Sequence, residues 1–310
     1  MPIPISAQKP PALRGVLLHN EPMAGHTTWR VGGPARQFYQ PLDADDLAVF
    51  LRQLPEKEPL FWVGLGSNLL VRDGGIQGTV IMTSGTLGGL AVGQDAVTVR
   101  AEAGVPCAKV ARFSARHDLT GIEFFAGIPG TVGGALAMNA GAFGGETWPV
   151  VQAVETLDRN GVHHMRVPSD YQISYRHVVG PADEWFIAAH FNLQKGEGAT
   201  SMTQIKDLLE KRNRTQPTHQ PSCGSVFRNP PGDHAARLIE ASGLKGVCIG
   251  GACVSVKHAN FIVNAGTATA TDIEALIVRV AETVEREHGI KLIREAHIIG
   301  EFQGAEVRHE

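Results

Sequence analysis

Cysteine is scarce in this chain, with four residues among 310. So few cysteines cannot build a disulfide scaffold for a chain of this length, and no two of them form a Cys-x-x-Cys pair. We therefore expect neither a disulfide framework nor a zinc or other metal site, and the usage is typical of a reducing cytoplasmic environment. The four cysteines are Cys107, Cys223, Cys248 and Cys253.

A surplus of one charge sign is also missing, because 28 Lys and Arg oppose 31 Asp and Glu. This balance excludes a strongly basic nucleic-acid-binding protein, and the 43% hydrophobic content excludes a disordered chain. The amino terminus lacks the apolar region of a signal peptide, so none is expected. Residues 124–145 carry no charge, but seven glycines and Pro129 make them a poor helix, so we expect no membrane span.

Glycine, in contrast, is abundant, with 36 residues among 310 against a usual share of about 7%. Glycine costs conformational entropy unless the backbone turns sharply or approaches something closely. We therefore expect a ligand that lies along the main chain. The chain length predicts two or three domains.

Hydrophobic periodicity predicts a mixed order of helices and strands, which indicates an α+β protein. The clearest predicted helix starts at a capping box of Thr271 and Glu274 and ends at Gly289. Residues 195–203 are small and polar, so they are predicted to be a linker. Further helices are expected at 43–54, 106–117 and about 205–212, and strands at 60–63, 79–82, 96–103, 150–157, 185–193, 259–263 and 291–299.

The first glycine-rich segment runs from Gly64 to Leu70 after a short apolar run. A dinucleotide-binding fingerprint would need glycine where this chain has Leu69, so the segment is not that fingerprint. Its backbone N–H groups, with Ser67 and Asn68, could still bind a pyrophosphate. Taken alone, a plain turn between strands explains it better.

The second glycine-rich segment runs from Gly127 to Gly144. Glycine removes Cβ atoms where a flat cofactor or its phosphates lie on the chain, and backbone amides then bind a pyrophosphate without Lys or Arg. A packing loop between sheets is the alternative, but so many glycines would weaken it. Two such segments around a strand-rich middle favour the ligand.

Residues 26–302 resemble the UDP-N-acetylenolpyruvoylglucosamine reductase family, because seven motifs occur in the family's order. The resemblance implies an FAD-binding fold of the vanillyl-alcohol and p-cresol oxidase type, in two subdomains, plus a smaller α+β substrate-binding domain. The motifs are HTTWRVGGP from His26, GLGSNLL from Gly64, the glycine-rich run from Gly127, SYR from Ser174, GSVFRNP from Gly224, HANFIVN from His258 and EAHIIG from Glu295.

The resemblance implies that FAD and NADPH are the cofactors and that the chain reduces UDP-N-acetylglucosamine enolpyruvate to UDP-N-acetylmuramate for peptidoglycan synthesis. We expect a cytoplasmic monomer with a small-molecule substrate, no nucleic acid and no membrane insertion. The implied domains are residues 20–86 with the carboxy-terminal strand 291–302 as the first FAD-binding subdomain, 87–197 as the second, and 203–290 as the substrate-binding domain.

The family's reaction passes hydride from NADPH to FAD and from flavin N5 to the terminal enol carbon. Negative charge then builds on the adjacent carbon and its carboxylate, which requires a cation, a proton donor and a group that holds both. The resemblance assigns these catalytic roles to Arg176, Ser225 and Glu295. On sequence alone, each also fits an ordinary role: a strand-end arginine, a turn serine and half of an exposed ion pair with Arg294.

The resemblance also implies two binding sets. Lys211, Arg212 and Arg214 form a basic run that fits a diphosphate or, equally, a solvated helix end. Tyr175 is expected against the nicotinamide or the substrate. The cofactor-binding residues implied are Gly64, Gly66, Ser67, Asn68, Leu69, Gly127, Ile128, Gly130, Thr131, Gly133, Gly134, Asn139, Gly141 and Ala142. The substrate-binding residues implied are Tyr175, Asn229, Lys211, Arg214, His258 and Asn260.

Three departures from the family pattern stand out. Val178 lacks a hydroxyl that the family commonly has there, and Phe143 replaces a common tyrosine. No tyrosine lies between Arg176 and Ser225, which indicates the shorter-loop branch that lacks a tyrosine-bearing substrate loop. The alternatives are another flavin oxidoreductase of the same fold, acting on an alcohol or a lactone, and a nucleotide-sensing protein without activity. The absence of histidine from residues 62–115 argues against covalently attached flavin.

Overall fold

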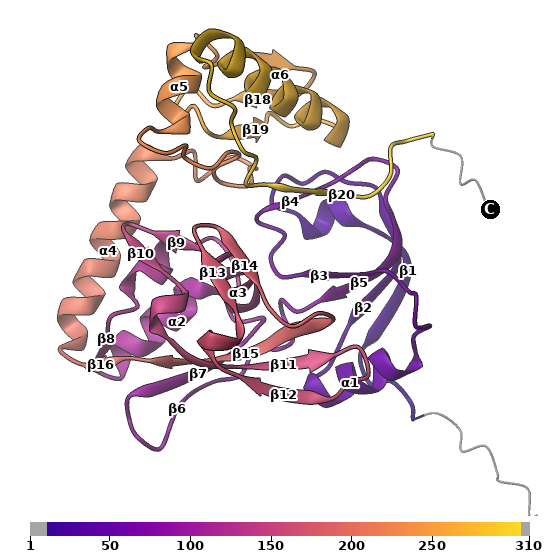
Figure 1. Cartoon of the computed structure of the whole chain (residues 1–310), viewed down its shortest axis with the longest axis vertical. Coiled ribbons are helices and arrows are strands. Elements are labelled where there is room, and N and C mark those ends of the chain that lie inside the picture. The colour runs from indigo at the N-terminus through magenta and orange to yellow at the C-terminus, as the bar shows by residue number, and fades with distance from the viewer. Residues whose placement is uncertain (1–10, 305–310) are drawn as a thin grey trace, which may run out of the picture.

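Three larger β-sheets organise residues 11–304, the part of the chain that the computed structural model describes. We expected no signal peptide at the amino terminus. Most of that segment, residues 1–10, lies outside the described residues. Two sheets form the body of the molecule, and the third belongs to a lobe at one end (Figure 1). No helix between residues 11 and 304 has the length and apolar character needed to cross a membrane.

The first sheet has four strands in the order β1-β2-β5-β3. β1 is antiparallel to β2, whereas β2, β5 and β3 run parallel to one another. Helix α1 packs its buried face between this sheet and the second, and the Asp43 carboxylate caps its first turn. The bounds are β1 Val16–Pro22, β2 Pro34–Gln40, α1 Ala44–Gln53, β3 Leu60–Val63 and β5 Ile76–Met82.

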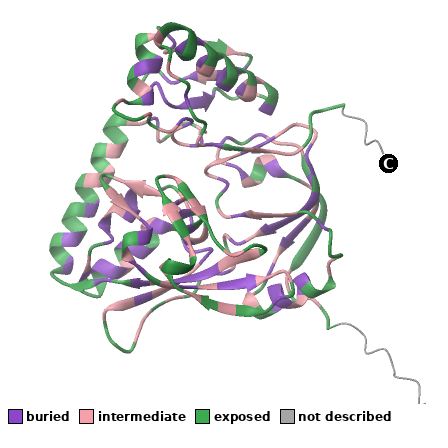
Figure 2. Ribbon diagram, in the orientation of Figure 1, coloured by how far each residue is buried: buried purple, intermediate pink, exposed green. Residues whose placement is uncertain are grey.

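The second sheet is antiparallel, with five strands in the order β12-β11-β15-β7-β6. Helices α2, α3 and α4 lie on one side of it, and Figure 2 shows buried residues concentrated on the central strands. The bounds are β6 Leu90–Val92, β7 Thr98–Glu102, α2 Cys107–Arg116, α3 Val132–Met138, β11 Val151–Asp158, β12 His163–Arg166, β15 Glu184–Asn192 and α4 Gly198–Thr215.

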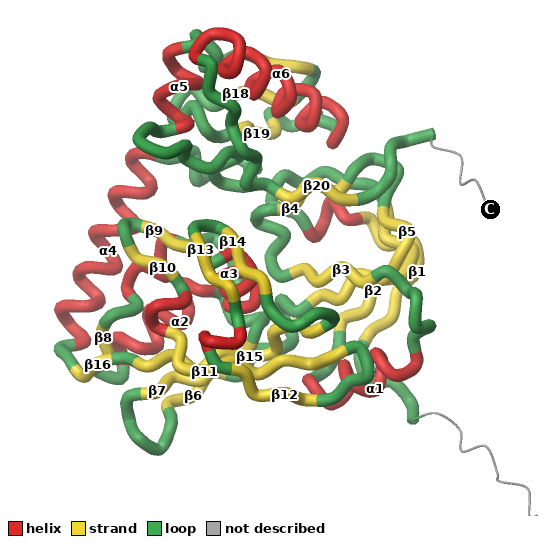
Figure 3. Tube along the Cα trace, in the orientation of Figure 1, coloured by secondary structure: helices red, strands yellow, loops and turns green. Residues whose placement is uncertain are grey.

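The third sheet, β17-β18-β19, is short and antiparallel and packs against α5 and α6. Helix α4 leads from the second sheet to this lobe, and the chain then returns so that β20 pairs in parallel with β4 (Figure 1). Loops make up much of the lobe (Figure 3). The bounds are β4 Leu69–Val71, α5 Ala235–Ala241, β17 Cys248–Ile249, β18 Ala252–Val254, β19 Ile262–Asn264, α6 Ala270–His288 and β20 His297–Ile299.

Three further strand pairs are small but place residues near one another. The pair β13–β14 is a tight hairpin with Tyr175 and Arg176 at its turn. The others are β9 with β10 and β16 with β8. The bounds are β8 Leu119–Thr120, β9 Gly141–Ala142, β10 Gly145–Glu146, β13 Gln172–Ser174, β14 His177–Val179 and β16 Gln194–Lys195, and short 3₁₀ turns occupy Met23–His26, Glu123–Gly127, Trp148–Val150 and Pro168–Asp170.

The predicted linker at 195–203 is wrong over most of its length, because α4 begins at Gly198. The small residues there serve close packing rather than flexibility. A methyl group at Gly198 would lie 2.0 Å from the Ala115 carbonyl oxygen. Ser201 is buried and donates to Glu123 at 2.6 Å.

The capping box of α6 lies two residues before the predicted one. Thr269 and Asp272 form it, and Gly289 ends the helix as expected. Thr271 and Glu274 instead contact the residues that follow β4. The Asp73 carboxylate accepts from the Thr271 backbone N–H and hydroxyl, and Arg72 donates to the Glu274 carboxylate. The predicted strand at 291–299 is likewise reduced to the three residues of β20.

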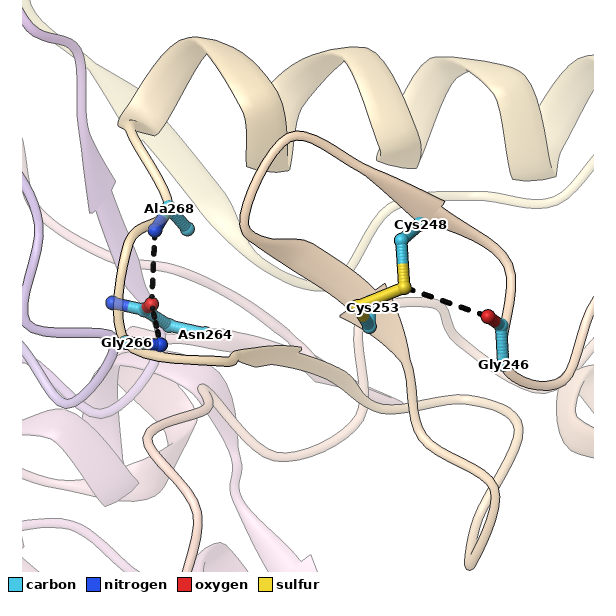
Figure 4. Close-up of a disulfide and its surroundings, with 6 residues drawn as sticks. All are labelled: Gly246, Cys248, Cys253, Asn264, Gly266 and Ala268. Atoms are coloured by element: carbon cyan, nitrogen blue, oxygen red, sulfur yellow. Dashed lines mark hydrogen bonds between the residues drawn. A yellow bond between two sulfur atoms is a disulfide. The ribbon is translucent and has the colours of Figure 1, made fainter.

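Cys248 and Cys253 form a disulfide across the β17–β18 hairpin (Figure 4), which the cysteine count did not anticipate. The two residues are cross-strand partners with Cα atoms 4.1 Å apart. One bond between neighbours in a hairpin is not a framework, because it closes a loop of only a few residues. Cys107 and Cys223 are free and buried.

Asp46 is the most deeply buried carboxylate of α1, and it yields a prediction. Burial alone would raise its pKa, but hydrogen bonds from the Tyr39 hydroxyl and the Arg14 and Leu42 amides outweigh burial and lower it. Because the pKa is lowered on folding, the charged carboxylate stabilises the fold fully at pH values above the carboxyl's ordinary pKa. This contribution is lost as the pH falls from the ordinary pKa through the lowered one.

We predict that Asp46→Asn lowers the free energy of unfolding by about 2 kcal/mol at pH 7, and that the difference from the parent chain narrows as the pH falls below about 4. Urea titration at several pH values measures both. Asp45→Asn is the matched control, because Asp45 is exposed on the same helix. A difference that stays constant with pH contradicts the prediction.

Candidate active site

A cavity of about 780 Å³ lies where the three larger parts of the structure meet. Its walls come from both glycine-rich segments, the β13–β14 turn, residues 223–225 and the segment that contains Glu295 and His297. The chain therefore brings segments more than 200 residues apart in sequence to one cavity. Within residues 11–304, no group of three or more His, Cys, Asp and Glu could hold a metal ion.

The two glycine-rich segments both line this cavity and contact each other. A methyl group at Gly64 would lie 2.3 Å from Thr131 Oγ1, and one at Gly66 would lie 2.1 Å from the His26 carbonyl oxygen. Gly66 also has a φ of +60°, which favours glycine. These two glycines are thus required by the protein's own contacts, whereas methyl groups at Gly130 and Gly134 would be 3.5 Å or more from any atom.

The cavity wall carries polar atoms that no residue satisfies. Thr131 Oγ1 and Trp62 Nε1 are buried without a hydrogen-bond partner in the described part of the chain. Buried polar groups are normally paired, so orphaned ones in a cavity wall indicate a bound ligand. A long ligand with phosphate and ring groups, such as FAD, fits this wall of backbone, hydroxyl and aromatic groups.

Arg176 is held firmly at the turn of the β13–β14 hairpin, where its φ is +56°. Its guanidinium donates to the Asn139 carbonyl at 3.1 Å and to the Gly141 carbonyl at 2.9 Å. Its Nε donates to Glu295 Oε1 at 3.1 Å. A guanidinium has five N–H groups, so N–H groups beyond these three contacts remain for a ligand.

Glu295 is mostly buried, with 15% of its side chain exposed. Burial raises the pKa of its carboxyl above the ordinary value, and the charge and hydrogen bond of Arg176 oppose that rise. Its backbone N–H donates to the Val226 carbonyl at 2.8 Å, and its carbonyl accepts from Asn68 Nδ2 at 3.0 Å. Glu295 therefore joins the first glycine-rich segment to the segment of Ser225.

Ser225 lines the cavity beside Gly224, whose φ is +82°. Its hydroxyl makes no hydrogen bond within residues 11–304, which leaves it available to a ligand. The segment is fixed by Asn260, whose side chain accepts from the Phe227 N–H at 3.0 Å and donates to the Phe227 carbonyl at 2.8 Å. Asn260 thus positions Ser225 without lining the cavity.

The structure brings together sixteen of the residues that the resemblance implied. Seven others do not line this cavity, for identifiable reasons. Lining it are Gly64, Gly66, Ser67, Asn68, Leu69, Gly127, Ile128, Gly130, Thr131, Gly134, Gly141, Ala142, Tyr175, Arg176, Ser225 and Glu295, and outside it are Gly133, Asn139, Lys211, Arg214, Asn229, His258 and Asn260.

Like Asn260, three other polar residues outside the cavity have framework roles. Asn139 is buried and bonds Glu146, Ser174 and the Trp148 N–H. Asn229 accepts from the Ala235 N–H at the start of α5. His258 packs its ring against Phe261, and burial lowers its pKa.

Two lining residues are absent from the implied binding sets, although Arg212 belongs to the predicted basic run. Arg212 lies between Lys211 and Arg214 on α4 and lines the cavity, whereas those two are exposed. Its Nε donates to Gln216 at 3.2 Å, no acidic residue pairs with it in residues 11–304, and burial lowers its pKa. Cys223 also lines the cavity, and burial raises the pKa of its thiol.

The chain matches two described families. Residues 35–165 match an FAD binding domain, and residues 216–299 match the UDP-N-acetylenolpyruvoylglucosamine reductase C-terminal domain. Together they span most of the described residues, including both glycine-rich segments and the Ser225 motif.

Similar proteins and a solved structure agree with both matches. UDP-N-acetylenolpyruvoylglucosamine reductases from Alkalilimnicola ehrlichii and Methylococcus capsulatus are 61% and 60% identical, over 93% and 94% of this chain and 96% and 95% of their own lengths. The crystal structure of UDP-N-acetylenolpyruvylglucosamine reductase (MurB) from Thermus caldophilus is 31% identical, with a TM-score of 0.76 over 93% of this chain and 99% of that one.

The predicted fold class is confirmed: an FAD-binding fold of the vanillyl-alcohol oxidase type with an additional α+β lobe. Identity of this level over nearly the whole of each relative shows membership of a family and excludes a chance likeness of fold. This chain belongs to the UDP-N-acetylenolpyruvoylglucosamine reductase family.

Proposed function

We propose that the cavity is the active site of a flavin reductase that converts UDP-N-acetylglucosamine enolpyruvate to UDP-N-acetylmuramate for peptidoglycan synthesis. FAD and NADPH are its cofactors. The observation that carries the site assignment is the meeting of Arg176, Ser225 and Glu295 at one cavity bounded by both glycine-rich segments. An alcohol or lactone oxidase of the same fold is disfavoured by the family match of residues 216–299.

The glycine-rich segments would hold FAD along its diphosphate. Backbone N–H groups of residues 64–69, the Ser67 hydroxyl and the orphaned Thr131 hydroxyl can donate to phosphate oxygens without a cation. When bound, FAD supplies the acceptor for hydride from NADPH and the donor of hydride to the substrate.

Arg176 would bind the substrate carboxylate. Three contacts to Asn139, Gly141 and Glu295 fix the guanidinium before the substrate arrives, so its remaining donors need no reorganisation. As negative charge moves onto the carboxylate in the transition state, a fixed cation interacts with it more strongly than with the ground state. Glu295 keeps this arginine in place.

Ser225 would donate the proton that completes the reduction. Its hydroxyl is at the cavity and makes no hydrogen bond within the described residues. A serine hydroxyl is a weak acid, so it protonates only a strongly basic carbanion, such as the one formed beside the carboxylate. Because the hydroxyl is such a weak acid, it does not donate its proton before hydride transfer has formed the carbanion.

Arg212, rather than the Lys211 and Arg214 selected from the same basic run, would bind the UDP diphosphate. The side chain is partly buried and lacks an acidic partner in the described residues, so an anionic ligand would replace its lost solvation. It also borders a second cavity of about 370 Å³, which contains Thr28, Arg30 and Gln220. This continuation gives the nucleotide room beyond the reacting groups.

We also propose the domain division 20–86 with 291–302, 87–197 and 203–290, a monomeric state and a location in the cytoplasm. The division is supported by the parallel pairing of β20 with β4, which returns the carboxy-terminal segment to the first sheet's side. It is also supported by separate hydrophobic clusters for the second sheet and for the α5–α6 lobe.

We predict that Ser225→Ala leaves NADPH able to reduce the bound flavin but slows flavin reoxidation by the substrate about 100-fold or more, as expected for loss of a general acid. Anaerobic stopped-flow absorbance separates the two half-reactions. Ser225→Cys, which keeps a proton on the side-chain atom, should recover part of the second rate. Normal reoxidation by Ser225→Ala would remove Ser225 from the mechanism.

We predict that Arg212→Ala raises the KM for the UDP-sugar at least tenfold, because a charge-assisted contact to phosphate is lost, while FAD content stays unchanged. Arg214→Ala, the same change two residues away on an exposed face of α4, should alter KM less than twofold. Steady-state kinetics and flavin absorbance measure both quantities. If Arg212→Ala lost FAD and kept its KM for the UDP-sugar, Arg212 would bind the cofactor and not the substrate.

A further inference from the structure

Two tryptophans stack on each other at the edge of the cavity. Trp62 lies on β3 of the first sheet and Trp185 on β15 of the second, and their ring centroids are 5.2 Å apart with planes inclined by 15°. Both line the main cavity and an adjoining cavity of about 250 Å³. The pair therefore stands where the two FAD-binding sheets approach each other.

These tryptophans differ from the two that serve the core. Trp29 and Trp148 are buried and donate their indole N–H to the carbonyls of Ile262 and Leu136, at 2.8 and 2.9 Å. Trp62 is the opposite case, because its Nε1 is buried without a partner in the described residues. Buried indole N–H groups normally find an acceptor, so the missing acceptor at Trp62 belongs to a ligand.

The position of the pair along the cavity indicates which part of a ligand it meets. Glu295 marks the reacting end, and its carbonyl accepts from Asn68. The first glycine-rich segment then leads back along the chain through Ser67 and Gly64 to Trp62. If the flavin ring lies by Glu295 and the diphosphate along residues 64–68, the other end of FAD reaches the tryptophans.

We propose that Trp62 and Trp185 bind the adenine ring of FAD by stacking, an assignment that rests on the proposed function. The separation of 5.2 Å is that of rings already in contact, so the adenine adds a third ring to the outside of the pair. An indole N–H lies in the plane of its ring and cannot reach a base stacked on the face of that ring, so Trp62 Nε1 donates to the ribose beside the base. The Tyr171 hydroxyl, also buried without a partner in residues 11–304, lies in the adjoining cavity as a second polar contact.

The test compares two flavins on the full chain stripped of its cofactor. FAD carries the adenine and FMN does not, so the pair should matter for FAD alone. We expect Trp185→Ala to weaken FAD binding about tenfold, the size expected for one lost aromatic–base stack, and to change FMN binding less than twofold. Trp185→Phe should keep most of the FAD affinity. Flavin fluorescence gives both dissociation constants.

A second readout does not depend on the flavin ring. ADP carries the adenine and diphosphate, and it should quench tryptophan fluorescence of the parent chain and not of the Trp62→Phe, Trp185→Phe double variant. Phe302→Ala, which removes an exposed aromatic over Arg72, is the control for a general effect of aromatic loss. Far-ultraviolet circular dichroism checks that each variant folds.

The possible results separate the inference from the proposed function. Failure of the parent chain to bind either flavin would overturn the proposed function itself. Equal binding of FAD and FMN by the parent chain, or equal losses of both in Trp185→Ala, would overturn the adenine assignment and leave the pair as a structural contact between sheets. Loss confined to FAD supports it.

Discussion

The site depends on one residue, Glu295. Its N–H donates to Val226 and its carbonyl accepts from Asn68, while its carboxylate pairs with Arg176. One residue near the end of the chain therefore fixes the first glycine-rich segment, the Ser225 segment and the β13–β14 turn relative to one another. Because these bonds are buried or partly buried, breaking one leaves a polar group unpaired, and the arrangement is held more tightly than separate surface contacts would hold it.

A second set of hydrogen bonds, outside the cavity, holds the α5–α6 lobe in position relative to Glu295. Arg72 pairs with Glu274 through two bonds of 2.9 Å, and Asp73 accepts from the first N–H groups of α6. Trp29 donates to Ile262 deep in the interface. Since the lobe supplies Ser225 and the first sheet supplies the glycine-rich segment, this clamp sets the width of the cavity between them.

Much of this was predictable from the sequence, and the failures have physical reasons. Period-3.6 patterns placed α1, α2 and α6, and motifs placed Arg176, Ser225 and Glu295 at one cavity. Motifs cannot tell which face of a helix meets the cavity, so Lys211 and Arg214 were selected from the basic run in place of Arg212 between them.

Contacts between residues on separate strands were equally unpredictable from the sequence. Trp62 and Trp185 lie far apart in sequence and meet only because two sheets converge, and Cys248 pairs with Cys253 only because a hairpin makes them neighbours. The glycine excess likewise had two causes: Gly66 allows close contact with the protein's own backbone, whereas a methyl group at Gly130 would meet no atom closer than 3.5 Å, so the protein's own packing does not require glycine there. The two arginines at the cavity, Arg176 and Arg212, also differ in whether the protein itself or a ligand satisfies them. Arg176 is bound by the protein on three contacts and so is preorganised for a transition state, whereas Arg212, lacking an acidic partner in the described residues, retains its binding capacity for the nucleotide.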